Sequence, residues 1–208
     1  MDHEFAPRLS SIFDDKERVA RAKQVRQRRN REGGWEFVEE MFSRRSRYLI
    51  LFVTLTYKEM YQDDVTLWTI RAQRDRFFKH IENSVDSFLS GIRGCIWHLE
   101  EGTKSGGLHL HLLIFYSGEF RGDMYYAQKI GECWVNVITG GWGAYWNSNA
   151  KKDKRDYPWG VAIGQVDRGS VKQDSLREFI DNYMAKNNQV PTMRRSEHLF
   201  GIRTFNRY

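Results

Sequence analysis

Two histidines separated by one residue, His109 and His111, are the side chains of this chain with the clearest chemical potential. They lie in residues 107–116, where leucines alternate with them before a longer apolar run. Successive side chains of a β-strand point to opposite faces, so this alternation places both imidazoles on one face and the leucines against a core. Two imidazoles so placed can hold one divalent metal ion. The same pattern also fits two hydrogen-bonded surface histidines on a half-buried strand, so other parts of the chain must decide.

The strand that precedes the histidines offers a carboxylate as a third ligand. Residues 92–100 are predicted to form this strand, and the glycine-rich residues 102–107 to form the turn of a hairpin. If the apolar residues of the two strands share a face, Glu100 lies beside the histidines and Glu101 on the other face, whereas a bulge at the strand end reverses this. His98 shares the face of Glu100 and is interpreted as a support for the ligands or as an ordinary strand histidine. Two imidazoles and a carboxylate suit Mn, Fe, Zn or Mg, so the ligand types alone do not name the metal.

Composition limits the class of protein. The chain has 208 residues, of which 40% are hydrophobic, enough for one packed domain with an appendage. A formal net charge of +6 favours a polyanionic partner but does not distinguish DNA, RNA or an acidic membrane surface. Cys95 and Cys133 are too few for a disulfide framework and lack zinc-ligand spacing, which favours a reducing cytoplasm. No secretory signal is recognised, and the longest apolar run, residues 48–57, is far shorter than the roughly 20 residues of a membrane helix. We therefore expect no membrane partner.

The N-terminal segment, residues 1–46, is interpreted as a basic helical appendage. Residues 14–30 are predicted to be helical, with the glycine pair Gly33-Gly34 as a stop signal. Residues 18–31 contain seven basic residues and no acidic one, a density that predicts contact with phosphates but also occurs on solvated helix faces without a partner. The apolar residues that follow are expected to dock the appendage onto the body. The DNA-binding residues proposed in this segment are Arg21, Arg26 and Arg28.

The body is predicted to be built around residues 48–57. This segment is rich in β-branched and aromatic side chains and nearly continuous in apolar character, as in a central strand covered on both faces. Apolar residues at helical spacing predict an amphipathic helix over residues 65–89, ended by Gly91. Further predicted elements are a helix over residues 124–137, a strand over 161–166 and a helix over 175–187. Residues 120–157 are treated as an insertion, in which glycines from residue 140 onward open a long connection.

Within this insertion, lysines stand close in sequence to tryptophans. Cations and aromatic faces together can bind single-stranded nucleic acid, the bases by stacking and the phosphates by charge, although tryptophans that anchor a loop explain the pattern equally well. The tryptophans are Trp142, Trp146 and Trp159. The cations proposed as DNA-binding residues are Lys151, Lys152 and Lys154.

The last predicted helix carries a tyrosine and a lysine three residues apart, Tyr183 and Lys186. Residues three apart lie on neighbouring positions of one helix face, where an ammonium can stabilise a phenolate or a phosphate oxygen. Tyr183 also continues an apolar stripe, and a tyrosine in such a position usually packs in a core. The spacing alone leaves both roles open.

Three segments in order along the chain resemble the three motifs of the His-hydrophobic-His (HUH) endonucleases. They are Phe-Val-Thr-Leu-Thr-Tyr at residues 52–57, His-Leu-His at residues 109–111 and Tyr-Met-Ala-Lys at residues 183–186. The resemblance covers residues 48–208 and is greatest to the single-tyrosine initiators of rolling-circle replication in small plasmids and bacterial viruses, including filamentous phages. It implies an α+β domain at residues 47–208, with a central antiparallel sheet of ferredoxin-like (RRM-like) topology and flanking helices. The expected elements agree with this fold.

The resemblance implies a role for each candidate residue. His109 and His111, with Glu100 added from the strand parity, are expected to hold Mg or Mn, which acts on the scissile phosphate. Tyr183 is expected to be the nucleophile that becomes linked to a 5′-phosphate. The charge of Lys186 favours its phenolate, because the ordinary pKa of tyrosine is about 10. The expected substrate is a single-stranded DNA origin, either linear or folded as a hairpin. The expected location is the cytoplasm of a bacterial host.

The turn before the histidine strand lacks the G-x-x-x-x-G-K-[ST] spacing of a nucleotide-binding loop, because Thr103 precedes Lys104. Unwinding is therefore assigned to a helicase of the host, which acts with the host replication machinery. A conjugative relaxase and a single-tyrosine transposase share the same chemistry and stay open as alternatives. A non-catalytic DNA-binding regulator of the same fold is a third.

Overall fold

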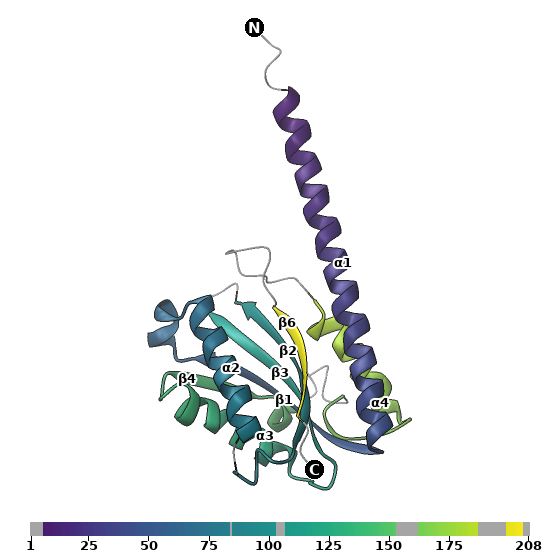
Figure 1. Cartoon of the computed structure of the whole chain (residues 1–208), viewed down its shortest axis with the longest axis vertical. Helices are drawn as coiled ribbons and strands as arrows, with labels where there is room; N and C mark the ends of the chain where they lie inside the picture. Colours follow the sequence, from purple (N-terminus) through teal and green to yellow (C-terminus); the bar gives the residue numbers. More distant parts are fainter. Residues whose placement is uncertain (1–5, 84, 103–106, 153–161, 187–198, 206–208) are drawn as a thin grey trace.

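The fold is α+β, with a six-stranded antiparallel sheet flanked by helices, as the sequence predicted. The computed structural model describes residues 6–83, 85–102, 107–152, 162–186 and 199–205, with side chains from residue 16 onward. The strand order is β4-β1-β3-β2-β6 (Figure 1). Strand β5 also pairs with β1. The strands are β1 Arg47–Tyr57, β2 Ile92–Glu101, β3 Leu108–Ser117, β4 Gly143–Asn147, β5 Gly164–Asp167 and β6 Phe200–Thr204.

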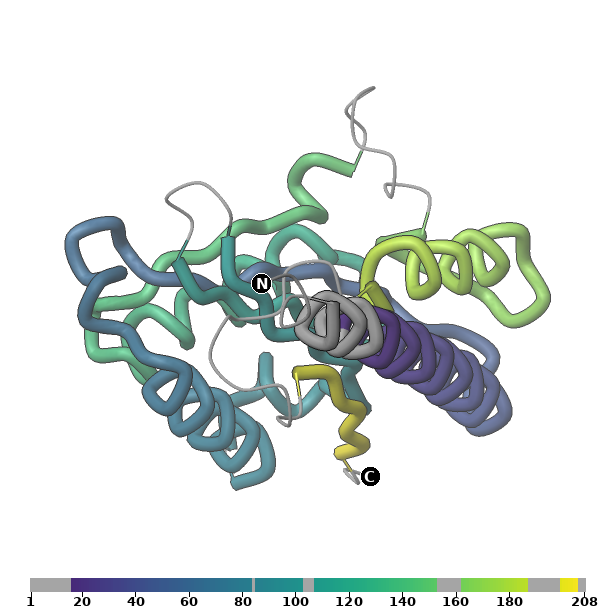
Figure 2. Tube along the Cα trace, turned by 90° about the horizontal axis from the view of Figure 1, so that it is seen from above, coloured from purple at the N-terminus to yellow at the C-terminus, as the bar shows by residue number. Residues whose placement is uncertain are grey.

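Strand β1 is central and covered on both faces, which confirms the expectation from its apolar sequence. One of its edges pairs with β3, and the other pairs with β5 near its start and with β4 near its end. Leu49 and Leu51 pack in a core with α2 (Leu67–Asn83) and α3 (Asp123–Cys133). Ile50 and Phe52 point to the opposite face and pack in a second core with α1 (Ala6–Arg44) and α4 (Val171–Phe179). Figure 2 shows α2 on one side of the sheet and α1 and α4 on the other.

Short helical segments complete the described structure. The helices α3 and α4 each continue directly into a π-helical turn, η2 (Trp134–Ile138) and η5 (Ile180–Met184). The 3-10 turns are η1 (Glu59–Asp64) and η3 (Asn149–Lys151). No helix within the described ranges is long and apolar enough to cross a membrane.

Helix α1 does not stop at Gly33-Gly34, so that expectation is wrong. The helix has 39 residues and, at about 1.5 Å per residue, is about 58 Å long; its N-terminal half extends beyond the body (Figure 1). A Cβ atom added at Gly34 would lie 2.6 Å from Cγ2 of Ile180 in η5, so the glycine allows close packing of α1 on η5. The helix continues because its next two turns bury apolar side chains, as expected for the docking segment. These are Phe37, Val38, Met41 and Phe42.

Helix α2 ends at Asn83, earlier than the predicted residue 89. The predicted apolar stripe included Val85 and Leu89. Leu89 is buried, but Val85 is 98% exposed, so the stripe does not continue through residue 85. Gly91 does not end the helix either. Gly91 instead allows the ring of Tyr116 to pack closely on the backbone, because an added Cβ atom there would lie 2.1 Å from Cζ of Tyr116.

The region treated as an insertion contributes to the sheet. Residues from 143 onward, expected in a long connection, form the edge strand β4. Helix α3 and the turn η2 cover β1 with buried Ile130 and Trp134 respectively. Residues 153–157 lie outside the described residues. The division into an appendage and a domain with an insertion stays a prediction. Strand β5 begins at Gly164, where residue 161 was predicted, and α4 begins at Val171, where residue 175 was predicted.

Candidate active site

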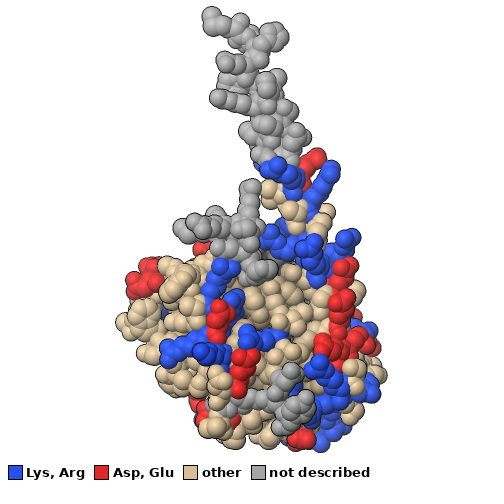
Figure 3. All heavy atoms as spheres, viewed as in Figure 1, with Lys and Arg blue, Asp and Glu red and all other residues tan. Residues whose placement is uncertain are grey.

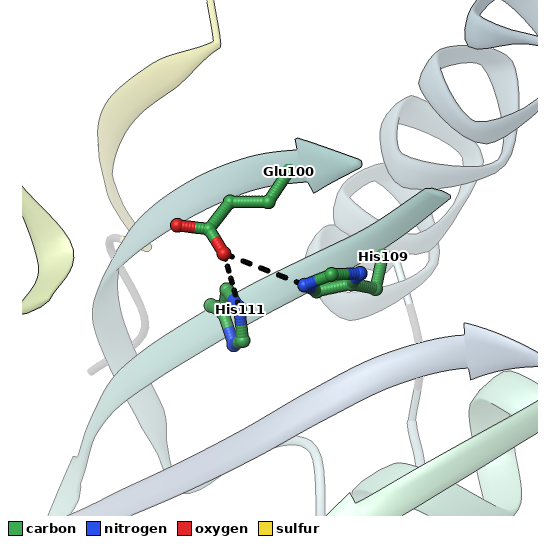
Figure 4. Close-up of side chains that lie close together, drawn as sticks. All are labelled: Glu100, His109 and His111. Atoms are coloured by element: carbon green, nitrogen blue, oxygen red, sulfur yellow. Dashed lines mark hydrogen bonds and ion pairs between the residues drawn. The ribbon is translucent and has the colours of Figure 1, made fainter. Parts of the chain in front are cut away.

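Glu100, His109 and His111 converge on one face of the β2–β3 hairpin (Figure 4). Oε2 of Glu100 lies 3.4 Å from Nε2 of His109 and 3.2 Å from Nε2 of His111. One potential ligand atom from each residue lies within 4.8 Å of the other two, which makes the three residues a candidate group for holding one metal ion. The hairpin register explains the convergence, because Glu100 pairs with His109 directly across the two strands.

The strand parity expected from the sequence is confirmed for the two neighbouring glutamates. Glu101 pairs with Leu108 and is exposed, on the face opposite the histidines. The irregularity in the β2–β3 ladder lies at its other end, between Ile92 and Gly94, so no bulge reverses the parity near Glu100. Glu100 is therefore the carboxylate beside the histidines, and its role as a ligand stays a prediction.

Hydrogen bonds to the other ring nitrogens orient both imidazoles. Nδ1 of His111 lies 2.9 Å from Oγ1 of Thr54, and Nδ1 of His109 lies 3.3 Å from the carbonyl oxygen of Gly107. While Nε2 of neutral His111 donates to Glu100, its Nδ1 accepts from the Thr54 hydroxyl. If the ring proton moves to Nδ1, Nδ1 donates to the Thr54 oxygen and the lone pair of Nε2 is free for a metal, and such outer partners also fix the ring. Thr54 lies in the first of the three motifs, but sequence reasoning gave it no role. Its register explains the contact, because Thr54 pairs with His111 across β1 and β3.

The charges of the cluster suit metal binding near neutral pH. Burial alone would raise the pKa of Glu100, but hydrogen bonds with His109 and His111 outweigh it and hold that pKa well below its usual range. Burial lowers the pKa of His111, and this effect exceeds the opposing hydrogen bond with Glu100. A charged carboxylate and a neutral imidazole are the forms that bind a metal, so metal binding requires only that the ring proton of His111 lie on Nδ1.

His98 lies behind the cluster. It is 2% exposed, and its Nδ1 lies 3.3 Å from Oε1 of Glu100, the oxygen that faces away from the other two histidines. Burial lowers the pKa of His98 to about 4, so the ring is neutral near pH 7. A neutral ring makes no ion pair with Glu100, and its Nδ1 makes no hydrogen bond, so both interpretations of His98 stay open.

Tyr183 lies beside the candidate metal ligands although 72 residues separate it from His111 in the sequence. The centroid of its ring lies 5.2 Å from that of His111, with the two rings nearly perpendicular. Phe52 and Phe179 flank the same ring at centroid distances of 5.6 and 5.5 Å. Tyr183 is half-buried, so it belongs partly to the second core and partly to the site.

The expected geometry of Tyr183 and Lys186 is wrong. The α-helix ends at Phe179, Tyr183 lies in the π-helical turn η5, and Lys186 follows that turn. The backbone N–H of Lys186 donates to the carbonyl oxygen of Tyr183 over 3.4 Å. A π-helical turn closes i→i+5 hydrogen bonds, so residues three apart no longer lie one above the other as in an α-helix. A catalytic role for Lys186 stays a prediction without that argument.

The arginines proposed for DNA binding lie on the part of α1 where Lys and Arg gather above the body (Figure 3). Arg21 and Arg28 are exposed, each with a glutamate four residues away at 3.7 Å, Glu17 and Glu32 respectively. Arg26 is half-buried. Ion pairs this exposed are weak, so the arginines can exchange a glutamate for a phosphate.

The three lysines of the insertion have different environments. Nζ of Lys151 lies 5.8 Å from the ring centroid of Trp146. Nζ of Lys152 lies 2.6 Å from Oδ2 of Asp123, which is buried, so this cation has a structural partner that a phosphate must displace. Lys154 lies outside the described residues. DNA binding by these residues stays a prediction.

Comparison with family models, with curated proteins and with solved structures finds no match to this chain. The HUH hypothesis therefore rests on the three motifs and on where their side chains lie.

Proposed function

We propose that this chain is a metal-dependent endonuclease that nicks and rejoins single-stranded DNA through Tyr183, and that it starts and ends rolling-circle replication in this way. The observation that carries the proposal is the meeting of three distant segments at one place. Thr54 bonds to His111, Glu100 contacts both histidines, and the ring of Tyr183 lies 5.2 Å from that of His111. A tyrosine that served only to fill the core would have no reason to lie beside this histidine cluster. The replication role comes from the resemblance of the motifs.

The donor set fits a divalent metal. Two imidazole nitrogens and one carboxylate oxygen can bind Mg or Mn, and Glu100, charged near neutral pH, offsets part of the metal charge. Of these two, Mn accepts imidazole ligands more readily, because Mg prefers oxygen donors. When bound, the metal supplies Lewis-acid stabilisation of the scissile phosphate.

The protein residues then hold and direct the nucleophile. Phe52 and Phe179 pack against the ring of Tyr183 and restrict its orientation. After loss of the phenol proton, Oη of Tyr183 attacks the phosphorus, the bond from phosphorus to the 3′-oxygen breaks, and that oxygen takes up a proton as a 3′-hydroxyl. The 5′-phosphate stays on Tyr183 as a phosphodiester. A 3′-hydroxyl can later attack this ester and release the tyrosine, so rejoining needs no ATP.

Cleavage of a pool of random single-stranded oligonucleotides tests the function without knowledge of the origin. After incubation with Mn and denaturation, DNA that stays attached to the protein is recovered and sequenced. We expect one sequence to be enriched, and we expect a chelator or the double variant His109→Ala/His111→Ala to abolish the adduct while much of the DNA binding remains, because binding uses distributed cations.

A matched pair of variants controls for surface charge. Glu100→Gln should strongly reduce cleavage, whereas Glu101→Gln, on the opposite face of β2, should leave it within about twofold of the wild type, as is usual for surface changes. Cleavage that persists in chelator contradicts the metal-dependent mechanism. Enrichment restricted to hairpin ends indicates transposition, and DNA binding without any adduct indicates the regulator.

A further inference from the structure

The face that carries the candidate site continues past the metal ligands to the edge of the sheet. Four residues lie in one cross-strand row: Trp146 pairs with Thr54, Thr54 with His111, and His111 with His98. Directly paired residues point to the same face, so Trp146 shares the face of the ligands. Two strand spacings separate it from His111, which is about 10 Å at about 4.8 Å per strand.

Trp146 differs from the other tryptophans on nearby elements in how it is used. Trp134 is fully buried and donates its indole N–H to the carbonyl oxygen of Thr56. Trp142 stacks on Tyr61, with ring centroids 4.9 Å apart and an interplanar angle of 5°. Trp146 is 54% exposed, and the ammonium of Lys151 lies over its ring. A single exposed aromatic residue is ordinary, but this one adjoins the site and has a cation beside it.

The backbone that carries Trp146 and Lys151 is held firmly against β1. Asn149, between them in sequence, is fully buried. Its Oδ1 accepts from the backbone N–H of Phe52 over 2.8 Å, and its Nδ2 donates to the carbonyl oxygen of Ile50 over 3.0 Å. The ring and the ammonium are therefore placed by the same strand that carries Thr54.

We propose that Trp146 stacks on an unpaired base close to the scissile phosphate, and that Lys151 contacts the phosphate of the same nucleotide. This inference rests on the proposed function, and it names the part of the site that receives the strand beside the cleaved bond. Aromatic rings on such surfaces bind any base by stacking, while cations follow the phosphates. The row of side chains from Trp146 to His111 connects the proposed base-stacking residue to the proposed metal ligands, so the bound DNA can follow it.

Binding measured in chelator separates the two contributions without cleavage. The probes are a fluorescent 12-residue dT strand and an abasic strand of equal length, which keeps the phosphates and lacks every base. Trp146→Ala should weaken binding of dT by about 5-fold to 150-fold, the usual range for one stacked base, and leave binding of the abasic strand unchanged. Trp146→Phe should restore most of the affinity for dT. Lys151→Gln should weaken binding of both strands, and it should lower the slope of log affinity against log salt by the share of about one phosphate contact.

The matched control is Trp68→Ala. Trp68 is 78% exposed and lies on α2, against the opposite face of the sheet, so its removal should change neither affinity. Equal loss for both strands in Trp146→Ala, no loss for dT, or no measurable binding of dT by the wild type overturns the proposal. Loss for dT alone supports it even if no strand is ever cleaved, whereas the adduct experiment above addresses cleavage independently.

Discussion

Thr54→Val tests whether the hydroxyl on β1 orients His111, a proposed metal ligand. The change replaces one oxygen by a methyl group and removes the 2.9 Å hydrogen bond to Nδ1 of His111, a ring that is only 4% exposed. Loss of such an outer partner lowers metal affinity by about 10-fold to 100-fold. The buried nitrogen left without its partner should also lower the free energy of unfolding by about 1–3 kcal/mol.

The assay is calorimetric titration of the chain with Mn, together with urea unfolding of the metal-free protein. Thr54→Ser is the matched control, because it keeps the hydroxyl and removes only a methyl group. We expect Thr54→Ser to bind Mn with nearly the affinity of the wild type and Thr54→Val to bind it much more weakly. Equal Mn affinity for the two variants refutes an orienting role of the hydroxyl, even if both are less stable than the wild type.

Two further predictions concern α1. Gly33→Ala should raise the free energy of unfolding by about 1 kcal/mol, because alanine favours a helix and the added Cβ atom would lie at an ordinary 3.6 Å from Ile202. Gly34→Ala should instead be neutral or destabilise by up to about 2 kcal/mol in the same urea assay, since overpacking against Ile180 offsets that gain; equal effects of the two changes would contradict the packing of α1 on η5. Replacement of three arginines by neutral residues should weaken binding of the abasic strand and reduce the slope of its affinity against salt. An unchanged slope would mean that this helix face is merely solvated. These arginines are Arg21, Arg26 and Arg28.

The features predicted well from sequence depend on local patterns, which are a continuous apolar run in β1 and alternation in the hairpin. The apolar run in β1 indicated a strand covered on both faces, and the positions of His109 and His111 indicated their common face. Strand parity then selected Glu100 over Glu101. The inferences about the histidines and Glu100 need only the period of two along a strand and one hairpin, so they do not depend on distant contacts.

The features that the sequence did not predict depend on distant contacts. The continuation of α1 through Gly34 depends on Ile180, far along the chain, and on burial of the residues that follow. The positions of Thr54 and Trp146 in the same cross-strand row as His111 depend on the register of β1 with β3 and β4. The π-helical turn around Tyr183 has no signal in the apolar spacing, which fits an α-helix equally well.

The position of the covalent link to DNA tests the central claim most directly. The adduct formed with the enriched strand is denatured, digested with nuclease and trypsin, and analysed by mass spectrometry. The tryptic peptide of residues 178–186 has Tyr183 as its single tyrosine, so the assignment needs no further fragmentation. We predict a nucleotide on this peptide, no adduct in Tyr183→Phe, and an undiminished adduct in Tyr125→Phe, a control at an exposed tyrosine on α3. A nucleotide on any other tyrosine, or an adduct that persists in Tyr183→Phe, would contradict the account.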